Sequence, residues 1–190
     1  DTPNSMAALD GITINTIAYQ QESWYIGNDT GLILCDDNWN RVENELTDMF
    51  ENIRIRCIKA DSRGNVWIAS YSDFPVVCYN AQEGSIKQFS SEDGLTGNKA
   101  RVIEEMSDGS IVVGTQSGID IFVNGELKKS YGHADGLSNP TILCIAEGKD
   151  GELVLGSDGD GIYVIKDGKI TNYGFDEGLG EGVVLRLLYD

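Results

Sequence analysis

The stretch YGHADGLSNPTILCIAEGKDGELVLG, residues 131–156, contains a turn, an apolar strand, a tight Gly turn and a second strand. Its Asp-Gly-Leu motif at 135–137 also occurs at 93–95, and the leucines of the two copies are 42 residues apart. Leu179 follows after another 42 residues. A fixed step of this size is the sequence signature of a repeat protein, and it outranks any local pattern.

Each copy contains four short segments with the alternation and the β-branched or aromatic content of strands. Turns rich in Gly, Asn and Asp separate these segments. Residues 44–51 are expected to form a loop or at most one helical turn. The expected strands are residues 13–19, 23–27, 32–35 and 41–43; 53–60, 66–70, 75–79 and 85–89; 100–106, 110–115, 119–123 and 127–131; and 141–146, 152–157, 162–165 and 169–173.

Four antiparallel strands in a unit of this length are typical of a β-propeller blade, so the sequence predicts an all-β propeller fold. The last residues, Val183–Tyr189, are expected to form one extra strand. We therefore expect a fragment of a larger propeller of about seven blades. The expected bounds are 10–47, 48–92, 93–134 and 135–176 for four blades, with 177–190 supplying the first strand of a further blade.

The charge of the chain excludes some partners. It has 14 Lys and Arg against 31 Asp and Glu, a formal net charge of −17. Nucleic acid and anionic lipid would be repelled, so no nucleic-acid partner is expected. No apolar run reaches the roughly 20 residues of a membrane span. Contact with a membrane is therefore expected only through flanking segments outside this sequence.

The four cysteines each lie in an apolar strand segment, and none forms a Cys-x-x-Cys pair, so the zinc-site pattern is missing. We expect buried thiols that act as small hydrophobic side chains. A disulfide would require two such strands to meet, and the sequence leaves that alternative open. The cysteines are Cys35, Cys57, Cys78 and Cys144.

The repeated turn and strand motifs resemble the two-component regulator propeller repeat. The clearest match is Asp61–Ser70, a turn followed by a Trp-containing strand, and residues 158–162 match the entry to the third strand. Aromatic residues close the copies at Phe89, Tyr131 and Tyr173. The resemblance implies the extracytoplasmic sensor region, periplasmic or at the cell surface, of a bacterial membrane signalling protein. In that family a membrane span and a histidine kinase or diguanylate cyclase follow the propeller, and some members sense carbohydrates.

Candidate ligand-binding residues are few. Trp39 stands among Asp and Asn residues at 36–40, a combination that can stack a sugar ring and bond its hydroxyl groups. The alternative is a packing contact, which is the expectation for Trp67 in the most motif-like strand. His133, the only histidine, lies in a loop between blades, where binding residues are often found, but a loop position also tolerates an incidental polar residue.

Repeated and paired carboxylates form the second group of candidates. Asp93 and Asp135 occupy the same repeat position, which makes them candidate ligand contacts, although repetition favours bonds to loop amides. Asp158 and Asp160 flank a Gly like the start of a calcium loop, yet no bidentate Glu follows at the required offset. We expect a hairpin turn there and no metal or cofactor.

The resemblance therefore implies a sensor that binds a small-molecule or carbohydrate ligand, and we expect that the chain itself is not an enzyme. Two alternatives remain, a propeller-based lyase or glycosidase and a protein-interaction scaffold. An enzyme would need converging carboxylates, which sequence alone does not locate. Open strand edges and uncovered apolar faces predict self-association.

Overall fold

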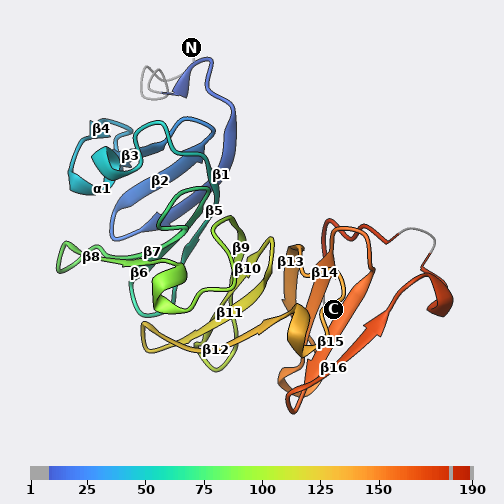
Figure 1. Cartoon of the computed structure of the whole chain (residues 1–190). Coiled ribbons are helices and arrows are strands. Elements are labelled where there is room, and N and C mark those ends of the chain that lie inside the picture. The colour runs from blue at the N-terminus through green and yellow to red at the C-terminus, as the bar shows by residue number, and fades with distance from the viewer. Residues whose placement is uncertain (1–8, 180–181, 189–190) are drawn as a thin grey trace. The chain divides into compact units, whose positions relative to one another are not determined.

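The computed structural model describes residues 9–179 and 182–188, and strands make up nearly all of the regular secondary structure in this part of the chain (Figure 1). Its strands form four separate four-stranded antiparallel sheets in which sequence neighbours pair, as the fold prediction requires. Sheet 1 contains β1 (Ile14–Gln20), β2 (Ser23–Asn28), β3 (Leu32–Asp36) and β4 (Arg41–Val42); sheet 2 contains β5 (Ile55–Ala60), β6 (Asn65–Ser70), β7 (Val76–Asn80) and β8 (Ser85–Phe89); sheet 3 contains β9 (Ala100–Glu105), β10 (Ile111–Thr115), β11 (Gly118–Val123) and β12 (Glu126–Gly132); sheet 4 contains β13 (Ile142–Glu147), β14 (Leu153–Ser157), β15 (Ile162–Lys166) and β16 (Lys169–Tyr173).

The sixteen strands expected from the four repeats are all present, and their ends lie within two residues of the predicted ends. The largest difference is at the start of β5, which begins at Ile55 because the backbone N–H of Ile53 donates to Phe50 at 3.1 Å and closes a turn. Helical segments are short. They are α1 (Glu45–Met49) and the 3₁₀ turns η2 (Ser91–Asp93), η3 (His133–Asp135), η4 (Lys149–Gly151) and η5 (Phe175–Glu177).

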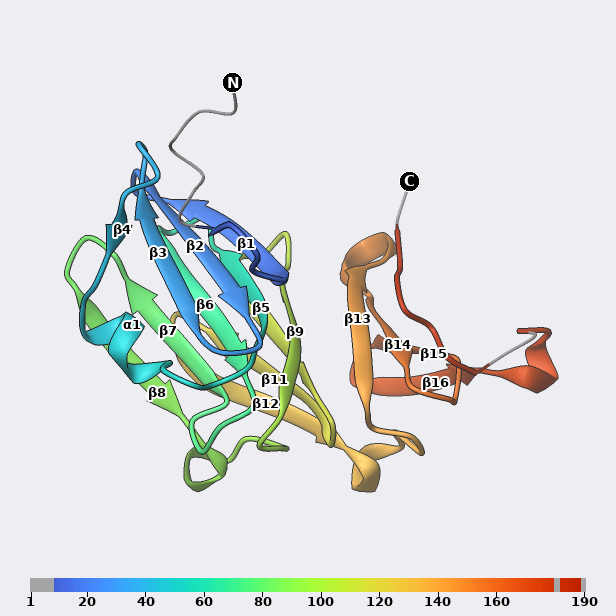
Figure 2. The ribbon, with the colours of Figure 1, turned by 90° about the horizontal axis from the view of Figure 1, so that it is seen from above.

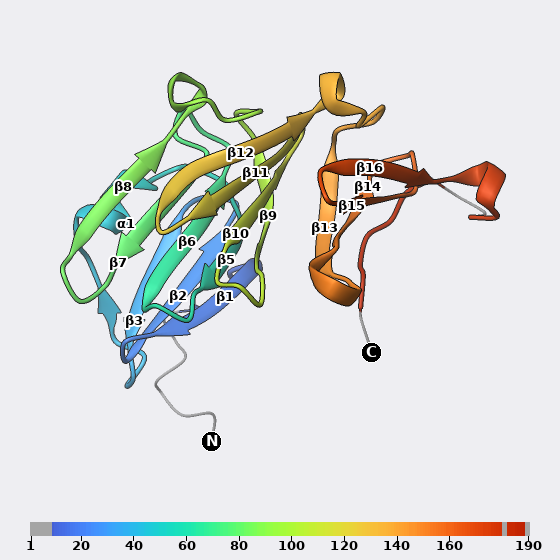
Figure 3. The same ribbon diagram turned by 90° about the horizontal axis from the view of Figure 1, so that it is seen from below.

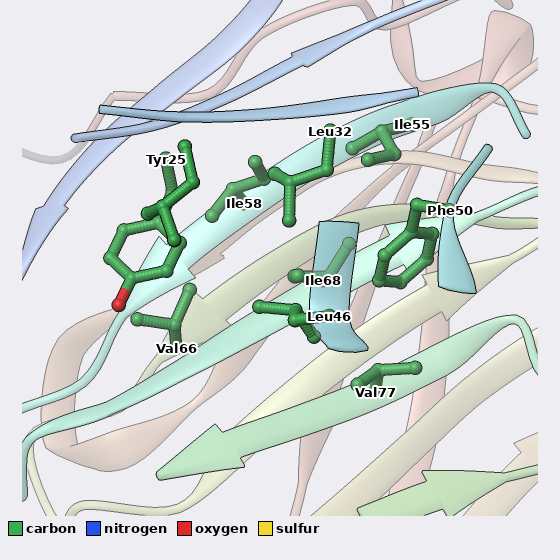
Figure 4. Packing of buried hydrophobic residues seen from close by; sticks show 10 residues of the cluster. Tyr25, Leu32, Leu46, Phe50, Ile55, Ile58, Val66, Ile68 and Val77 are labelled. Atoms are coloured by element: carbon green, nitrogen blue, oxygen red, sulfur yellow. The ribbon is translucent and has the colours of Figure 1, made fainter. Parts of the chain in front are cut away.

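The described residues form two compact units, unit 1 up to Gln88 and unit 2 from Phe89 onward. In unit 1, β1–β3 lie against β5–β7, and apolar side chains of the two sheets fill the space between them (Figures 2 and 4). The small residue at the end of β2 permits this approach, since a Cβ on Gly27 would lie 2.5 Å from a methyl carbon of Ile55. The core residues are Tyr25, Leu32, Leu34, Leu46, Phe50, Ile55, Ile58, Val66, Ile68 and Val77.

The helical turn α1 adds to this core. Asn44 caps it, accepting from the backbone N–H of Thr47 at 3.1 Å while the Thr47 hydroxyl accepts from the backbone N–H of Asn44. The turn carries Leu46 into the core, where it is 1% exposed, and Phe50 follows it. Residues 44–51 are thus the single helical turn that the sequence allowed.

Unit 2 contains sheets 3 and 4 (Figure 3), and apolar side chains of both sheets again form one core. A Cβ on Gly114, at the end of β10, would meet Ile142 of β13 at 2.9 Å, as Gly27 meets Ile55 in unit 1. The shared position explains why Gly closes these second strands. The core residues are Met106, Val112, Ile119, Tyr131, Leu137, Ile142, Ile145, Leu155, Tyr163 and Ile165.

The predicted extra strand at Val183–Tyr189 requires a correction. Over the described residues 182–188 the segment makes only an isolated antiparallel bridge between Val183 and Asp158 and is not a strand. Val184 nevertheless occupies the place of a next first strand, because it fills the space beside Gly156 and donates its N–H to the Ser157 carbonyl at 3.0 Å. No described strand pairs with its other edge, so a ladder does not form. Tyr189 lies outside the described residues.

The turn between β5 and β6 shows why this motif is clear in the sequence. The Asp61 carboxylate accepts from the backbone N–H groups of Arg63 and Asn65 at 3.0 and 2.7 Å, and Gly64 takes the left-handed conformation with φ +91°. The same carboxylate accepts from the indole N–H of Trp67 at 2.9 Å. Trp67 is 1% exposed, so the packing role predicted for it is confirmed.

All four cysteines are free thiols. Cys35 and Cys144 are buried as expected, whereas Cys57 and Cys78 are only partly buried, which corrects the prediction for this pair. Burial raises the pKa of Cys78 to about 12, so this thiol is neutral at physiological pH. Within the described ranges no helix is long and apolar enough to cross a membrane.

Candidate functional site

The strongest cluster of polar groups in unit 1 lies where the first strands of its sheets begin. Antiparallel pairing brings two connections to this end of each sheet, the one entering the first strand and the one joining the second and third strands. We call it the loop end. Asn52 lies in the connection that enters β5, and Thr30 lies in the connection between β2 and β3. The backbone N–H of Asn52 donates to the Thr30 carbonyl at 2.8 Å, so the loop ends of sheets 1 and 2 are joined.

Four side chains meet at the loop end of unit 1. Arg54 Nε lies 2.9 Å from Asp29 Oδ1, and that oxygen also accepts from Asn15 Nδ2 at 2.7 Å. Asn15 Nδ2 donates to the Ile55 carbonyl as well, at 3.0 Å. The guanidinium of Arg54 stands over the ring of Tyr71, 5.8 Å from its centroid. We call Asn15, Asp29, Arg54 and Tyr71 the loop-end polar group.

This group has the components of a small-molecule site. Arg54 and Asp29 have side chains that are 44% and 55% exposed, so solvent reaches both. A guanidinium offers five N–H donors in a planar fork, and Asp29 engages it at Nε. The aromatic ring supplies an apolar surface beside the charges. The sequence analysis missed this group because its members come from four separate segments.

The corresponding loops of unit 2 contain a network of hydroxyl groups around one carboxylate. Asp160 accepts hydrogen bonds from the Ser138 hydroxyl and the Tyr163 hydroxyl, and Tyr163 accepts from the backbone N–H of Asn139 at 2.8 Å. The bond from Ser138, followed by that from Tyr163, lowers the pKa of Asp160. The network holds the β14–β15 turn against the loop that enters sheet 4.

Asp158 and Asp160, the weak metal candidates, do not converge with other ligands. Asp158 is exposed and bonds through its backbone, its carbonyl accepting from Asn139 Nδ2 at 2.6 Å. The carboxylate of Asp160 is occupied by Ser138 and Tyr163. In the part of the chain that the structure describes, no three His, Cys, Asp or Glu side chains are grouped to hold a metal ion.

The carboxylates of Asp93 and Asp135 close turns. Asp93 accepts from the Ser90 N–H at 2.9 Å and Asp135 from the Gly132 N–H at 2.8 Å, each around a 3₁₀ turn. The third copy of this contact is made by Glu177, not by the neighbouring Asp176. Both aspartates are exposed, but they satisfy loop amides in these positions.

His133 begins the 3₁₀ turn η3 and is exposed. Its Nδ1 lies 3.2 Å from the Leu137 carbonyl, so one ring nitrogen faces its own loop. Asp135 is in the same turn but bonds to Gly132 rather than to the imidazole. The structure therefore gives His133 no catalytic partner among these contacts, and ligand binding by it stays a prediction.

Trp39 belongs to an aromatic row on sheet 1. Its ring stacks on Trp24 with centroids 5.0 Å apart and an interplanar angle of 15°, and Trp24 contacts Tyr19 at 4.7 Å. The Tyr19 hydroxyl donates to Asp37 Oδ1 at 2.8 Å. Trp24 thus covers one face of Trp39. These residues lie on the face of sheet 1 that carries Ile26, at the hairpin end and not at the loop end.

A shallow cleft of about 390 Å³ opens at the outer edge of sheet 1. It exists because β4 pairs with β3 only at Leu34 and Cys35, before the chain turns into α1. Arg41, Glu43 and Asp48 line it. The cleft is mixed in charge, and Asn28, the buried polar residue in its lining, accepts from Thr30 within its own turn.

Each second strand ends in a buried polar residue that the sequence analysis did not single out. These residues bond within the turn that follows; for example, the Asn28 side chain accepts from the Thr30 N–H at 2.7 Å. A related case is Asp120 on β11, which is fully buried and accepts from Thr96 and Ser130. The four buried polar residues that end the second strands occupy one repeat position, which an alignment of the repeats shows. They are Asn28, Ser70, Thr115 and Ser157.

Comparison with known proteins supports the fold. Residues 49–72 match the family described as "Two component regulator propeller", which confirms the predicted repeat in that segment. A comparison with curated proteins gave no match. Among solved structures, the chain is similar to the extracellular domain of the putative hybrid two component system BT3049 from B. thetaiotaomicron, with 20% identity and a TM-score of 0.74. The match covers 90% of this chain and 24% of that one.

Two further structures show the same fold. The extracellular domain of the putative one component system BT4673 from B. thetaiotaomicron matches with 16% identity and a TM-score of 0.54 over 93% of this chain and 30% of that one. Virginiamycin B lyase from Staphylococcus aureus matches with 17% identity and a TM-score of 0.65 over 85% of this chain and 55% of that one. The chain therefore spans less than two thirds of each of these structures.

Proposed function

We propose that the chain is an extracytoplasmic sensing module of a bacterial membrane signalling protein and that it acts by binding a ligand rather than by turnover. The observation that carries this proposal is the two-component regulator propeller repeat at residues 49–72, set in four repeated sheets. Similarity to extracellular domains described as parts of two component and one component systems supports the same role and location. The expected output is a histidine kinase or a diguanylate cyclase.

The geometry suits a rigid receptor with binding groups at its loops. Within each unit the sheets are fixed by apolar packing between them, while exposed polar side chains gather at the loop end. A ligand that contacts these loops can change a signalling equilibrium only if it binds one state better than the other. The loop-end polar group is the proposed contact, with Trp39, His133, Asp93 and Asp135 as further candidates.

A second candidate function is that of a propeller enzyme, and the similarity to virginiamycin B lyase favours it. The contacts weigh against it, because the carboxylates of Asp93, Asp135 and Asp160 hold turns together and His133 faces its own loop. A general acid–base pair needs two such groups directed at one substrate.

The test is a thermal-shift screen of the purified chain against small molecules and oligosaccharides, with NMR analysis of each hit after incubation. A sensor is expected to gain thermal stability with a ligand that is recovered unchanged. A hit that is cleaved or eliminated would support the enzyme. Fusing the parent protein to a reporter active only outside the cytoplasm checks the location, and an inactive reporter would contradict it.

A further inference from the structure

The first strands of unit 1 share an irregularity next to the loop-end polar group. Both β1 and β5 contain a one-residue bulge, which falls at Asn15 between Ile14 and Thr16 and at Arg56 between Ile55 and Cys57. A bulge residue has no partner across the ladder, and such positions recur beside binding sites, where they redirect a side chain. Here both are polar.

The two bulges are adjacent in space. Asn15 Nδ2 donates to the carbonyl of Ile55, the residue that precedes Arg56, and the same nitrogen donates to Asp29. Asp29 in turn holds Arg54. Arg54 directly precedes β5 and Arg56 lies at its bulge, so the two arginines flank Ile55, whose carbonyl accepts from Asn15, and the guanidinium of Arg54 stands over the ring of Tyr71.

The guanidinium of Arg56 has an unsatisfied hydrogen-bond donor. Its Nε is buried and has no hydrogen-bond acceptor among the described residues. A buried guanidinium N–H without an acceptor is unfavourable, and such a group in a native protein requires an explanation, of which a bound water or ion is one. Arg54 keeps part of its fork exposed, because Asp29 engages only its Nε.

The two arginines stand out because the chain as a whole is acidic. The chain carries 31 acidic and only 14 basic residues, so two arginines separated by a single residue are a local excess of positive charge. The corresponding positions of the next first strand, in unit 2, are also basic, namely Lys99 and Arg101. A repeated basic pair at the start of first strands is not required for blade packing, since Thr141 and Leu143 stand there in sheet 4.

We propose that Arg54 and Arg56, with Asn15 and Tyr71, form a binding site for a small ligand that carries a carboxylate. The carboxylate would accept from the exposed edge of Arg54 and from Arg56, and the ring of Tyr71 would contact the body of the ligand. This inference rests on the proposed sensing function and gives it a ligand class.

The test uses D-glucuronate and D-glucose, which differ in the carboxylate at C6, with the whole chain and NMR or calorimetric titration. Glucuronate is expected to bind at least about tenfold more tightly than glucose, because only it has a carboxylate to form an ion pair with the guanidinium groups. Arg54→Gln and Arg56→Gln should each weaken glucuronate binding about tenfold or more. Arg54→Lys keeps the charge but loses the fork, and an intermediate loss is expected.

The matched control is Arg63→Gln, which removes an exposed arginine from the turn at the opposite end of the same sheet. It should change glucuronate binding less than twofold, since the Arg63 charge lies at the other end of the sheet. Equal binding of the two sugars, equal losses in all three Gln variants, or no glucuronate binding would overturn the site. The sensing function would survive if another ligand raises stability equally in the wild type and in Arg56→Gln.

Discussion

The first strands β1 and β5 have the same place in their sheets but different surroundings. Ile14 and Ile17 of β1 are 43% and 47% exposed, whereas Ile55 and Ile58, their counterparts in β5, are 0% and 5% exposed. The sequences of the two strands are equally apolar at these positions. What differs is that sheet 1 covers β5 within unit 1, while in the described chain no sheet of unit 1 covers that face of β1.

The contrast shows where the stability of this repeat arises. Hydrogen bonds within a sheet are alike in both cases, so the difference is the contact between neighbouring sheets, as in other repeat folds. Unit 2 has the same contrast at its fourth strands, because Tyr131 of β12 is 6% exposed and Tyr173 of β16 is 45% exposed. Covered and open faces of equivalent strands therefore offer matched pairs for experiment.

The largest effect is expected from cutting back the covered isoleucine. Ile55→Ala should lower the free energy of unfolding by about 3 kcal/mol, because it leaves a cavity beside Gly27. Ile14→Ala, at the same position in the open strand, should change it by about 0.5 kcal/mol or less. Urea denaturation of the two variants checks this pair. Equal losses would mean that contacts between sheets do not dominate.

The open face predicts self-association, the partner that we propose for this surface. Exposed apolar residues such as Ile17 and Tyr19 form a patch with the aromatic row of Trp24 and Trp39. A second copy that covers it would remove this surface from water. Light scattering over a range of concentrations should show the mass rising above that of one chain.

Ile17→Glu should weaken that association by about tenfold or more, because a carboxylate would have to be buried at the contact. Val42→Glu is the matched control, since Val42 is an exposed apolar residue (38% exposed) of the same sheet that pairs with Leu34 and lies on the other face. It should leave the mass distribution unchanged. A wild-type chain that stays monomeric at high concentration contradicts the prediction.

Two aspartates of unit 2, one buried and one partly exposed, are expected to make the stability of the fold depend on pH in opposite directions. Burial raises the pKa of Asp120, so the folded chain binds its proton more tightly than the unfolded chain. This group therefore adds stability as the pH falls from its folded pKa toward the ordinary value. Hydroxyl donors lower the pKa of the partly exposed Asp160, so its contribution is present above the ordinary value and is lost as the pH falls through the folded pKa.

The measurement is the free energy of unfolding from neutral pH down to roughly pH 2, well below the ordinary aspartate pKa. Relative to wild type, Asp120→Asn should lose stability increasingly on acidification, because it no longer gains a proton. Asp160→Asn should show the opposite trend and approach wild type at low pH. Parallel curves for the two variants would show that burial does not separate these groups.

The sequence predicted the fold well because its signals are local. Alternation marks the strands, and Gly64 marks a turn whose left-handed conformation it supplies. It also predicted the bonding of loop amides by Asp93 and Asp135, since a repeated residue serves a repeated contact. These features need only the repeat period and elementary conformational preferences.

The candidate site was not predicted, because its signals are not local. Asn15, Asp29, Arg54 and Tyr71 come together only when antiparallel pairing places four chain segments at one end. The bulge at Arg56 depends on a register shift that no alternation pattern shows. The strand predicted over residues 183–188 is wrong for a related reason. A strand-like sequence pattern does not supply a neighbouring strand to pair with.

The smallest effect is expected from the aromatic row. Trp39→Ala removes a ring that stacks on Trp24 but remains partly exposed, so unfolding should become easier by only about 1 kcal/mol. Trp67→Ala, in the covered sheet, should cost more than this, because it opens a cavity and leaves the buried Asp61 carboxylate without its indole donor. If titration with a neutral oligosaccharide quenches Trp39 fluorescence and Trp39→Ala abolishes binding, the ring serves a ligand as first predicted; if the variant only lowers self-association, the ring belongs to the open face.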